Sequence, residues 1–189
     1  MGQRPPDPLL TLVSAAGFSG WHAVNDRIMG GSSTGSCQAG PAGLVFQGEL
    51  IAEGGGFISC RSPLISPPLD LSQYSGLELE ISGDGRRFKL AVACADGLAG
   101  LTELIPGGLR WVHAFDTDAQ GPTLVRIPYS SLRPSVRAQP LGMPLLRFDA
   151  ARVNRLQLLH SRFGDDGQPN AGFRAGAITF TLHAIRAYP

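Results

Sequence analysis

Several features that would assign a chain of 189 residues to a specialised class are scarce or missing here. No window is apolar enough for a membrane-spanning helix, and no block of like charge marks a nucleic-acid footprint or a basic membrane patch. Lys89 is the only lysine, and the formal net charge is +1. We therefore expect neither membrane insertion nor nucleic-acid binding.

Targeting signals are also missing from the amino-terminal segment. Residues 1–8 lack the apolar stretch of a signal peptide and are too short and too rich in proline for an amphipathic transit helix. We expect these residues to form a flexible leader, followed by one domain over residues 9–189. The expected location is the cytoplasm.

Cysteine is scarce, with Cys37, Cys60 and Cys94 as the three examples. Three cysteines cannot all pair within one chain, and none of them has a Cys-x-x-Cys spacing. The favoured interpretation is a reducing compartment with buried or free thiols. One disulfide plus one free thiol is the alternative.

What the chain does have is a long series of short apolar runs, separated by many of its 25 glycines and 15 prolines. Runs such as 77–82 alternate apolar and polar residues, as half-buried strands do. No segment predicts a helix of three turns, although residues 9–24 fit either a short helix or a strand. Roughly eight to ten strands at this spacing predict an all-β fold, a two-sheet antiparallel β-sandwich or jelly roll.

Two strand predictions are specific enough to test. The runs 77–82 and 88–93 flank the turn Gly83-Asp84-Gly85 and predict a hairpin. The last strand, 177–188, places Ile178 and Phe180 on the face opposite Thr179. Long loops are expected at 95–109, 129–150 and 162–175, and ligand contacts in sandwiches usually come from loops or from one concave sheet face.

The least ordinary stretch runs from Trp21 to Ser33 and combines an aromatic residue, an Asn-Asp pair and a Met-Gly-Gly-Ser turn. Its glycines predict positive φ, and its Asn and Asp predict side chains that bond back to the backbone. We expect Trp21 to anchor this loop in the core. Met29 is expected to fill a gap in the core, with an exposed contact as the alternative.

Asp26 is the polar residue that stands out in this loop. We expect its carboxylate to accept N–H bonds from Met29, Gly30 or Gly31 and so to fix the loop, with recognition at an exposed rim as the alternative. Arg61 is a candidate ion-pair partner for Asp26 or for Asp84 across the end of the sandwich. Asp84 itself is expected to be a turn residue.

The stretch Asn25-Asp26-Arg27-Ile28-Met29-Gly30-Gly31-Ser32-Ser33 resembles the opening motif of the complex I intermediate-associated protein 30 family, Asn-Asp-x-(Val/Ile)-Met-Gly-Gly-x-Ser. Further segments resemble the motifs of that family in the same order: 44–48, 55–62, 70–77, 83–90 and 125–134. The resemblance covers roughly residues 18–187. Phe88 stands where the family commonly has Tyr, and segments 97–109 and 136–150 depart from its pattern.

This resemblance implies a galactose-binding-like jelly roll and a non-catalytic role in assembling membrane-associated electron-transfer complexes, either respiratory complex I or a photosystem. The implied partners are protein subunits of such a complex or its assembly intermediates, met at the surface of an energy-transducing membrane. No cofactor is implied. The lack of a mitochondrial presequence points to a stand-alone bacterial member, cyanobacteria included.

Two sets of residues are predicted to carry partner binding, with a sheet face as the alternative surface. The loop itself contributes Trp21, Asn25, Asp26, Met29, Gly30, Gly31 and Ser32. The supporting residues are Gly56, Phe57, Arg61, Asp84 and Lys89.

Other functions have weaker support in the sequence. A carbohydrate-binding module is the main alternative, with Trp21, Trp111 or Tyr129 stacking on a sugar ring. The run Gly31-Ser32-Ser33-Thr34-Gly35 matches the Gly-x-Ser-x-Gly pattern of hydrolases, but without the strand and helix that this mechanism needs. The loop after Phe115 begins like a calcium loop, yet Ile127 stands where the bidentate Glu belongs. No catalytic residue, metal or cofactor is therefore predicted.

Overall fold

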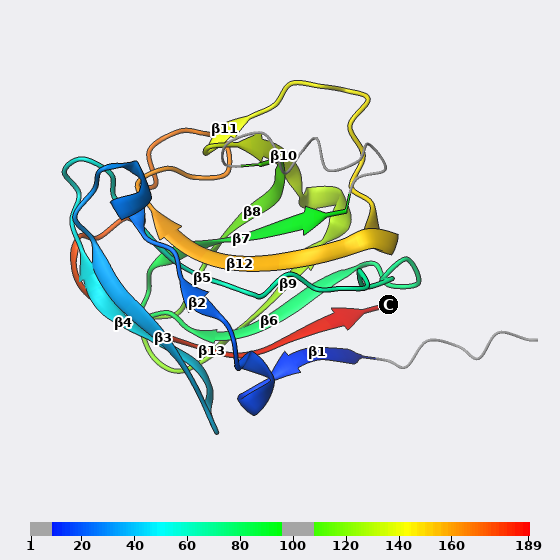
Figure 1. Cartoon of the computed structure of the whole chain (residues 1–189), viewed down its shortest axis with the longest axis horizontal. Coiled ribbons are helices and arrows are strands. Elements are labelled where there is room, and N and C mark those ends of the chain that lie inside the picture. Colours follow the sequence, from blue (N-terminus) through cyan, green and yellow to red (C-terminus); the bar gives the residue numbers. More distant parts are fainter. Residues whose placement is uncertain (1–8, 96–107) are drawn as a thin grey trace, which may run out of the picture.

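The computed structural model describes residues 9–95 and 108–189. The expected leader 1–8 and most of the expected loop 95–109 lie outside the described residues. The described chain forms two antiparallel sheets that pack face to face, which confirms the predicted all-β sandwich (Figure 1). Its helical segments are short 3-10 turns, and no described helix has the length and apolar character needed to cross a membrane.

The first sheet has six strands and is built around the long carboxy-terminal strand β13. One edge of β13 pairs with β6, while the other edge pairs first with β4 and then with β1. Strands β3 and β9 complete this sheet beyond β4 and β6. The strands are β1 (Leu10–Ser14), β3 (Thr34–Gly40), β4 (Gly43–Leu50), β6 (Gly76–Ser82), β9 (Thr123–Pro128) and β13 (Gly176–Tyr188).

The second sheet has seven strands in the order β11-β10-β8-β7-β12-β5-β2. Its centre is formed by β7 and β12, and its two edges are the two-residue strands β11 and β2. Short edge strands limit the unpaired backbone that a sheet offers to other chains. The strands are β2 (His22–Ala23), β5 (Phe57–Arg61), β7 (Arg87–Cys94), β8 (Arg110–Asp116), β10 (Arg133–Val136), β11 (Gln139–Pro140) and β12 (Val153–Ser161).

The core lies between the two sheets and follows the alternation of the strands. Ile178 and Phe180 of β13 are buried, and Thr179 between them is exposed, as predicted. Phe180 packs edge-on against Phe88 of the second sheet, with ring centroids 5.1 Å apart. Aromatic contacts of this kind add to the area that both rings bury, so they join the sheets as well as filling the core.

The predicted hairpin between 77–82 and 88–93 is wrong. These runs form β6 and β7, which lie in different sheets and pair with other strands. The turn between them crosses the edge of the sandwich, with Asp84 and Gly85 at φ values of 56° and 71°. Thr117 holds this crossing, because its Oγ1 donates a 2.6 Å hydrogen bond to the Arg86 carbonyl.

The cysteines correct a second expectation. Cys37 of β3 and Cys60 of β5 form a disulfide between the two sheets, and Cys94 is the free thiol. The favoured interpretation of three reduced thiols is therefore wrong, and the alternative of one disulfide plus one free thiol is correct.

His160 of β12 is a fully buried imidazole in the core. Its Nδ1 lies 2.7 Å from the Arg87 carbonyl, and its Nε2 accepts a 3.4 Å bond from the Arg174 N–H. A carbonyl needs a donor, so the ring is neutral with its proton on Nδ1. Burial, the largest cause, lowers the pKa of His160 to about 4 despite the bond to Arg87.

We expect this imidazole to make the protein acid-sensitive. Because its folded pKa lies below the ordinary value of 6.5, its contribution to stability is complete above pH 6.5 and is lost toward about pH 4. The loss amounts to about 3 kcal/mol. The unfolding free energies of wild type and His160→Gln, measured by urea denaturation across this range, should converge at the acid end. A constant difference at every pH would contradict this assignment.

Candidate functional site

The loop from Asn25 to Ser33 begins with the 3-10 turn η2 (Asp26–Met29) and ends where β3 starts. Gly30 closes η2 in the left-handed conformation at a φ of 86°, as the sequence predicted for a glycine here. Trp21 is 8% exposed and packs edge-on against Phe18, which agrees with its predicted role as an anchor. The loop therefore starts from a fixed point in the core.

The Asp26 carboxylate is fully buried and holds the loop from inside. Oδ1 accepts a 2.9 Å bond from the Ser33 N–H, and Oδ2 accepts a 2.7 Å bond from the Ser33 hydroxyl. Oδ2 also accepts bonds of 2.7 Å and 3.4 Å from the N–H groups of Gly56 and Phe57. One carboxylate thus joins two loops that are thirty residues apart in sequence.

The predicted role of Asp26 is correct, but the predicted donors are not. The carboxylate receives no bond from Met29, Gly30 or Gly31; the Gly31 N–H instead bonds to the Asp26 backbone carbonyl at 2.9 Å. Gly56 and Phe57 are two of the five predicted supporting residues, and their N–H groups bond to the Asp26 carboxylate. Long-range donors of this kind leave no trace in local sequence spacing.

Two glycines leave the space that this carboxylate occupies. A Cβ atom at Gly31 or at Gly55 would collide with the Asp26 side chain from either loop. Gly56 has a φ of 98°, and a Cβ there would meet the stem of Arg162. In each Gly-Gly pair, one glycine (Gly30 or Gly56) adopts a positive φ, and the other (Gly31 or Gly55) lets the backbone approach the Asp26 side chain closely.

Hydrogen bonding keeps Asp26 ionised although it is buried. Burial, the largest single influence, acts to raise its pKa, but the bonds from Gly56, Ser33 and Phe57 together outweigh burial and lower the pKa below 3.8. A buried carboxylate with this many donors is a stable anchor, because each donor would otherwise be left unsatisfied. Ser33 is fully engaged in this network, since its Oγ also accepts a 2.9 Å bond from the Ile51 N–H.

The apolar tip of the loop points outward. Met29 is 64% exposed and Ile28 is 72% exposed, so the prediction that Met29 fills the core is wrong. Because Asp26 fixes the inner side of the 3-10 turn, Ile28 and Met29 lie on its outer side. Ser32 and Gly30 are exposed as well, while Asn25 is half-buried and donates a 3.4 Å bond to the Gly35 carbonyl.

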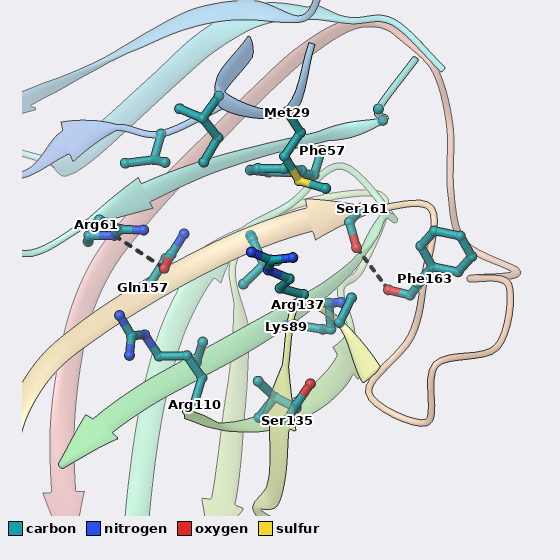
Figure 2. Close-up of a pocket in the computed structure, with 18 of the residues that line it drawn as sticks. Met29, Phe57, Arg61, Lys89, Arg110, Ser135, Arg137, Gln157, Ser161 and Phe163 are labelled. Carbon is teal, nitrogen blue, oxygen red and sulfur yellow. Dashed lines mark hydrogen bonds between the residues drawn. The ribbon is translucent and has the colours of Figure 1, made fainter. Parts of the chain in front are cut away.

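Ile28 and Met29 line one side of a cleft on the outer face of the second sheet. Figure 2 shows Met29 at this side of the cleft. The cavity measures about 250 Å³. Its floor comes from the outward residues of β7, β8 and β12, and its far side comes from β10 and the turn after it. The floor and walls include Phe57, Arg61, Lys89, Ala91, Arg110, Val112, Ser135, Arg137, Gln157, Leu159, Ser161 and Phe163.

The cleft gathers four cationic side chains. Arg61, Lys89, Arg110 and Arg137 line it, and none of the described lining residues is Asp or Glu. Arg61 also donates from Nε to Gln157 Oε1 at 3.4 Å. In Figure 2, Met29 and Phe57 lie on one side, Arg110 and Ser135 on the opposite side, and Lys89 and Arg137 between them.

Lys89 is the most buried of these cations, with 5% of its surface exposed. Its Nζ donates a 3.4 Å bond to the Gly164 carbonyl. Burial lowers the pKa of Lys89 to about 8, while nearby Asp165 and Asp166 act in the opposite direction. Near neutral pH the amine therefore carries most of a positive charge that is poorly solvated.

The supporting residues divide into two groups. Gly56 and Phe57 bind Asp26, and Phe57, Arg61 and Lys89 line the cleft. Asp84 belongs elsewhere, because it is a turn residue that pairs with Arg86 at 3.0 Å and with Arg174 at 3.6 Å. The predicted pairing of Arg61 with Asp26 or Asp84 is absent.

Sequence reasoning missed Arg110, Arg137 and Gln157 as parts of this site. The alternation of β8 and β12 would have placed Arg110 and Gln157 on an outward face, but not on the same cleft wall. Arg137 lies in a tight turn, with φ values of 51° and 65° at Arg137 and Ala138. Such a turn usually contains Asn or Gly, so its local sequence gave no signal.

The sequence also suggested a calcium loop after Phe115 and sugar stacking on Trp111 or Tyr129. The described residues include no group of three His, Cys, Asp or Glu side chains placed to hold a metal ion, and Asp116 pairs with Arg87 at 2.8 Å. Trp111 is 6% exposed and packs on Phe148, as does Tyr129 at 5.0 Å. Both rings border a second groove, whose other lining residues fall within 130–134 and 141–150, and which shares no lining residue with the Asn25–Ser33 loop.

A family model for complex I intermediate-associated protein 30 matches residues 10–182 of this chain. The chain belongs to this family. The match spans both sheets and the Asn25–Ser33 loop. No curated protein sequence matches the chain.

Solved structures share the fold of this family member. The family 11 carbohydrate-binding module of a cellulosomal cellulase from Clostridium thermocellum is 16% identical, with a TM-score of 0.63 over 95% of this chain and 94% of that one. The same family 11 module in complex with a β-1,3-1,4-mixed-linked tetrasaccharide is 17% identical, with a TM-score of 0.62 over 95% of both chains. An agarase is 7% identical, with a TM-score of 0.55 over 97% of this chain and 25% of that one. At such identities the likeness shows a shared jelly-roll sandwich.

We expect Asp26→Asn to destabilise the protein by about 3 kcal/mol, because the new amide group turns a donor toward backbone N–H groups that need an acceptor. Urea denaturation measures this loss. Asp70→Asn is the matched control, since Asp70 is exposed and also accepts bonds from one serine, Ser72. The control should change stability by less than about 1 kcal/mol. Equal losses in the two variants would contradict the anchoring role.

Lys89 can be followed alone, because the chain has no other lysine. With lysine labelled at 13Cε, the side-chain signal should titrate with a pKa of about 8. Asp165→Asn should lower that value further, because the Asp165 charge favours the protonated amine. Asp118→Asn makes the same charge change at an exposed residue and should leave the titration unchanged. A titration at the ordinary lysine value would show that Lys89 is solvated.

Proposed function

We propose that this protein is a non-catalytic binding factor that assists the assembly of a membrane-associated electron-transfer complex. The observation that carries the proposal is the loop itself, which the family motif encodes and which Asp26 holds in one conformation. A loop fixed in this way presents Ile28 and Met29 to a partner with little loss of conformational freedom on binding. Exposed apolar side chains at a fixed rim are typical of protein-interaction surfaces.

The chemistry of the loop supports binding rather than catalysis. The Ser33 hydroxyl, the one nucleophile suggested by the sequence, donates to Asp26 and lies in a buried network. Its neighbour is a carboxylate whose lowered pKa leaves it a poor base. We place the protein at the surface of an energy-transducing membrane, with subunits or assembly intermediates of one complex as partners.

The carbohydrate-binding alternative shares the fold but lacks the rings assigned to it. Sugar stacking needs an exposed aromatic face, and Trp21 and Trp111 are 8% and 6% exposed. Tyr129 packs against Phe148. The rings assigned to sugar stacking therefore offer no open face, and the aromatic side chains that line the cleft are Phe57 and Phe163.

The test is affinity purification of the tagged protein from its own organism in mild detergent, followed by mass spectrometry. We expect the wild type to enrich subunits of one membrane complex. Met29→Asp should reduce that enrichment by at least about tenfold, because a rim contact becomes charged. Leu124→Asp is the matched control, since Leu124 is 60% exposed on β9 of the other sheet. It should retain the partners.

Two results would count against the proposal. If the wild type enriches no membrane-complex subunit, the assembly role is wrong. If Met29→Asp and Leu124→Asp behave alike, the role stands but the Asn25–Ser33 loop is not the binding surface.

A further inference from the structure

The Asn25–Ser33 loop crosses from one sheet of the sandwich to the other. Just before the loop, Ala23 of β2 pairs with Cys60 of β5 in the second sheet. Directly after the loop, the chain enters β3 of the first sheet, where Thr34 pairs with Glu49. The two ends of the loop are therefore carried by β5 and β3, so the separation of these strands sets the span of the loop.

The Cys37–Cys60 disulfide joins these same two strands. Because β3 and β5 lie in different sheets, they do not pair through backbone hydrogen bonds. Each cysteine is the fourth residue of its strand, and their Cα atoms are 6.3 Å apart. The Asp26 carboxylate bonds to the residue just before each strand, Ser33 and Gly56. The two strands thus share one link made of hydrogen bonds and one covalent link.

The covalent link lies near the edge of both sheets. Strand β3 is an edge strand of the first sheet, and only the two-residue strand β2 separates β5 from the edge of the second. Cys37 is half-buried, whereas Cys60 is fully buried. The central strands β13 and β7 are joined separately, through the contact between Phe180 and Phe88. We therefore expect loss of the disulfide to loosen this edge while the core stays folded.

We propose that the Cys37–Cys60 disulfide is a redox switch for the Asn25–Ser33 loop: the oxidised form holds the loop in its binding conformation, and reduction releases the strands that carry its two ends. A loop that is already fixed loses little conformational freedom when a partner binds, and a released loop loses more. Reduction therefore weakens partner binding. This inference rests on the proposed function and adds its regulation.

The reductant that this switch needs is a dithiol. One of its thiolates attacks Sγ of Cys37, the less buried partner, and Cys60 leaves as a thiolate. The second thiol of the reductant attacks the resulting mixed disulfide and frees Cys37. Two electrons and two protons pass to the protein, and the dithiol becomes a disulfide. Cys94, the free thiol, is needed for neither step.

The first test treats the folded protein with dithiothreitol. Alkylation and mass spectrometry should count one reactive thiol before treatment and three after it. Native-state hydrogen exchange should then show that the Gly56 and Ser33 amides exchange at least about tenfold faster in the reduced protein. The core amides of β7 and β12 should keep their protection.

Variants connect the switch to partner binding without added reductant. Cys37→Ser leaves Cys60 as a thiol, so its Gly56 amide should exchange as in reduced wild type, with or without dithiothreitol. Cys94→Ser is the matched control, because it removes the cysteine outside the disulfide, and it should respond to dithiothreitol as the wild type does. In affinity purification, Cys37→Ser should enrich complex subunits at least about tenfold less than Cys94→Ser.

Several outcomes would overturn the inference. These are a disulfide that dithiothreitol reduces only after urea has unfolded the protein, unchanged exchange at Gly56 and Ser33 after reduction, or equal loss of protection in the core of β7 and β12. If Cys37→Ser and Cys94→Ser enrich the same subunits equally, the switch fails while the assembly role stands. If exchange responds as expected but no form of the protein enriches subunits, the assembly role fails while redox control of the loop is supported.

Discussion

The buried carboxylate of Asp26 is the interaction on which the rest of the site depends. A charge without solvent is costly unless donors surround it, and here the N–H groups of Ser33, Gly56 and Phe57 and the Ser33 hydroxyl do so. Satisfying that charge brings together two glycine-rich loops from distant parts of the chain. The consequence is a rim whose outer side chains, Ile28 and Met29, are held in place although they have little packing of their own.

The sheet behind that rim supplies the other half of the site. Strands β7 and β8 carry Ala91 and Val112 at outward positions, and both side chains line the cleft. Arg61, Lys89, Arg110 and Arg137 line the cleft, and on the opposite sheet Glu78 and Glu80 pair with Arg126 and Arg186. The same jelly-roll sandwich occurs in carbohydrate-binding modules, so the function follows from what each chain places on this scaffold rather than from the scaffold itself.

The sequence predicted those features that depend on local pattern. Alternation identified the strands and the inward residues of β13, and the Asn-Asp-x-x-Met-Gly-Gly pattern identified a fixed loop with a structural Asp26. The sequence did not predict features that depend on contacts between residues far apart in the chain. Period-two alternation is the same whether two strands share a sheet or face each other across the core, so β6 and β7 were wrongly paired. The disulfide between Cys37 and Cys60 and the convergence of Arg110 and Arg137 on one cleft likewise depend on topology.

Native-state hydrogen exchange at the Gly56 amide tests the central claim most directly. This N–H lies in a glycine-rich loop that would exchange quickly if it were merely a connection between strands. With a 2.7 Å bond to a buried carboxylate, we expect protection close to that of the core amides of β7 and β12. The Ser33 amide should show the same protection, because it donates to the same side chain. Exchange of Gly56 at the rate of an exposed loop would contradict the account, because the Asp26 carboxylate would then not hold the loops together.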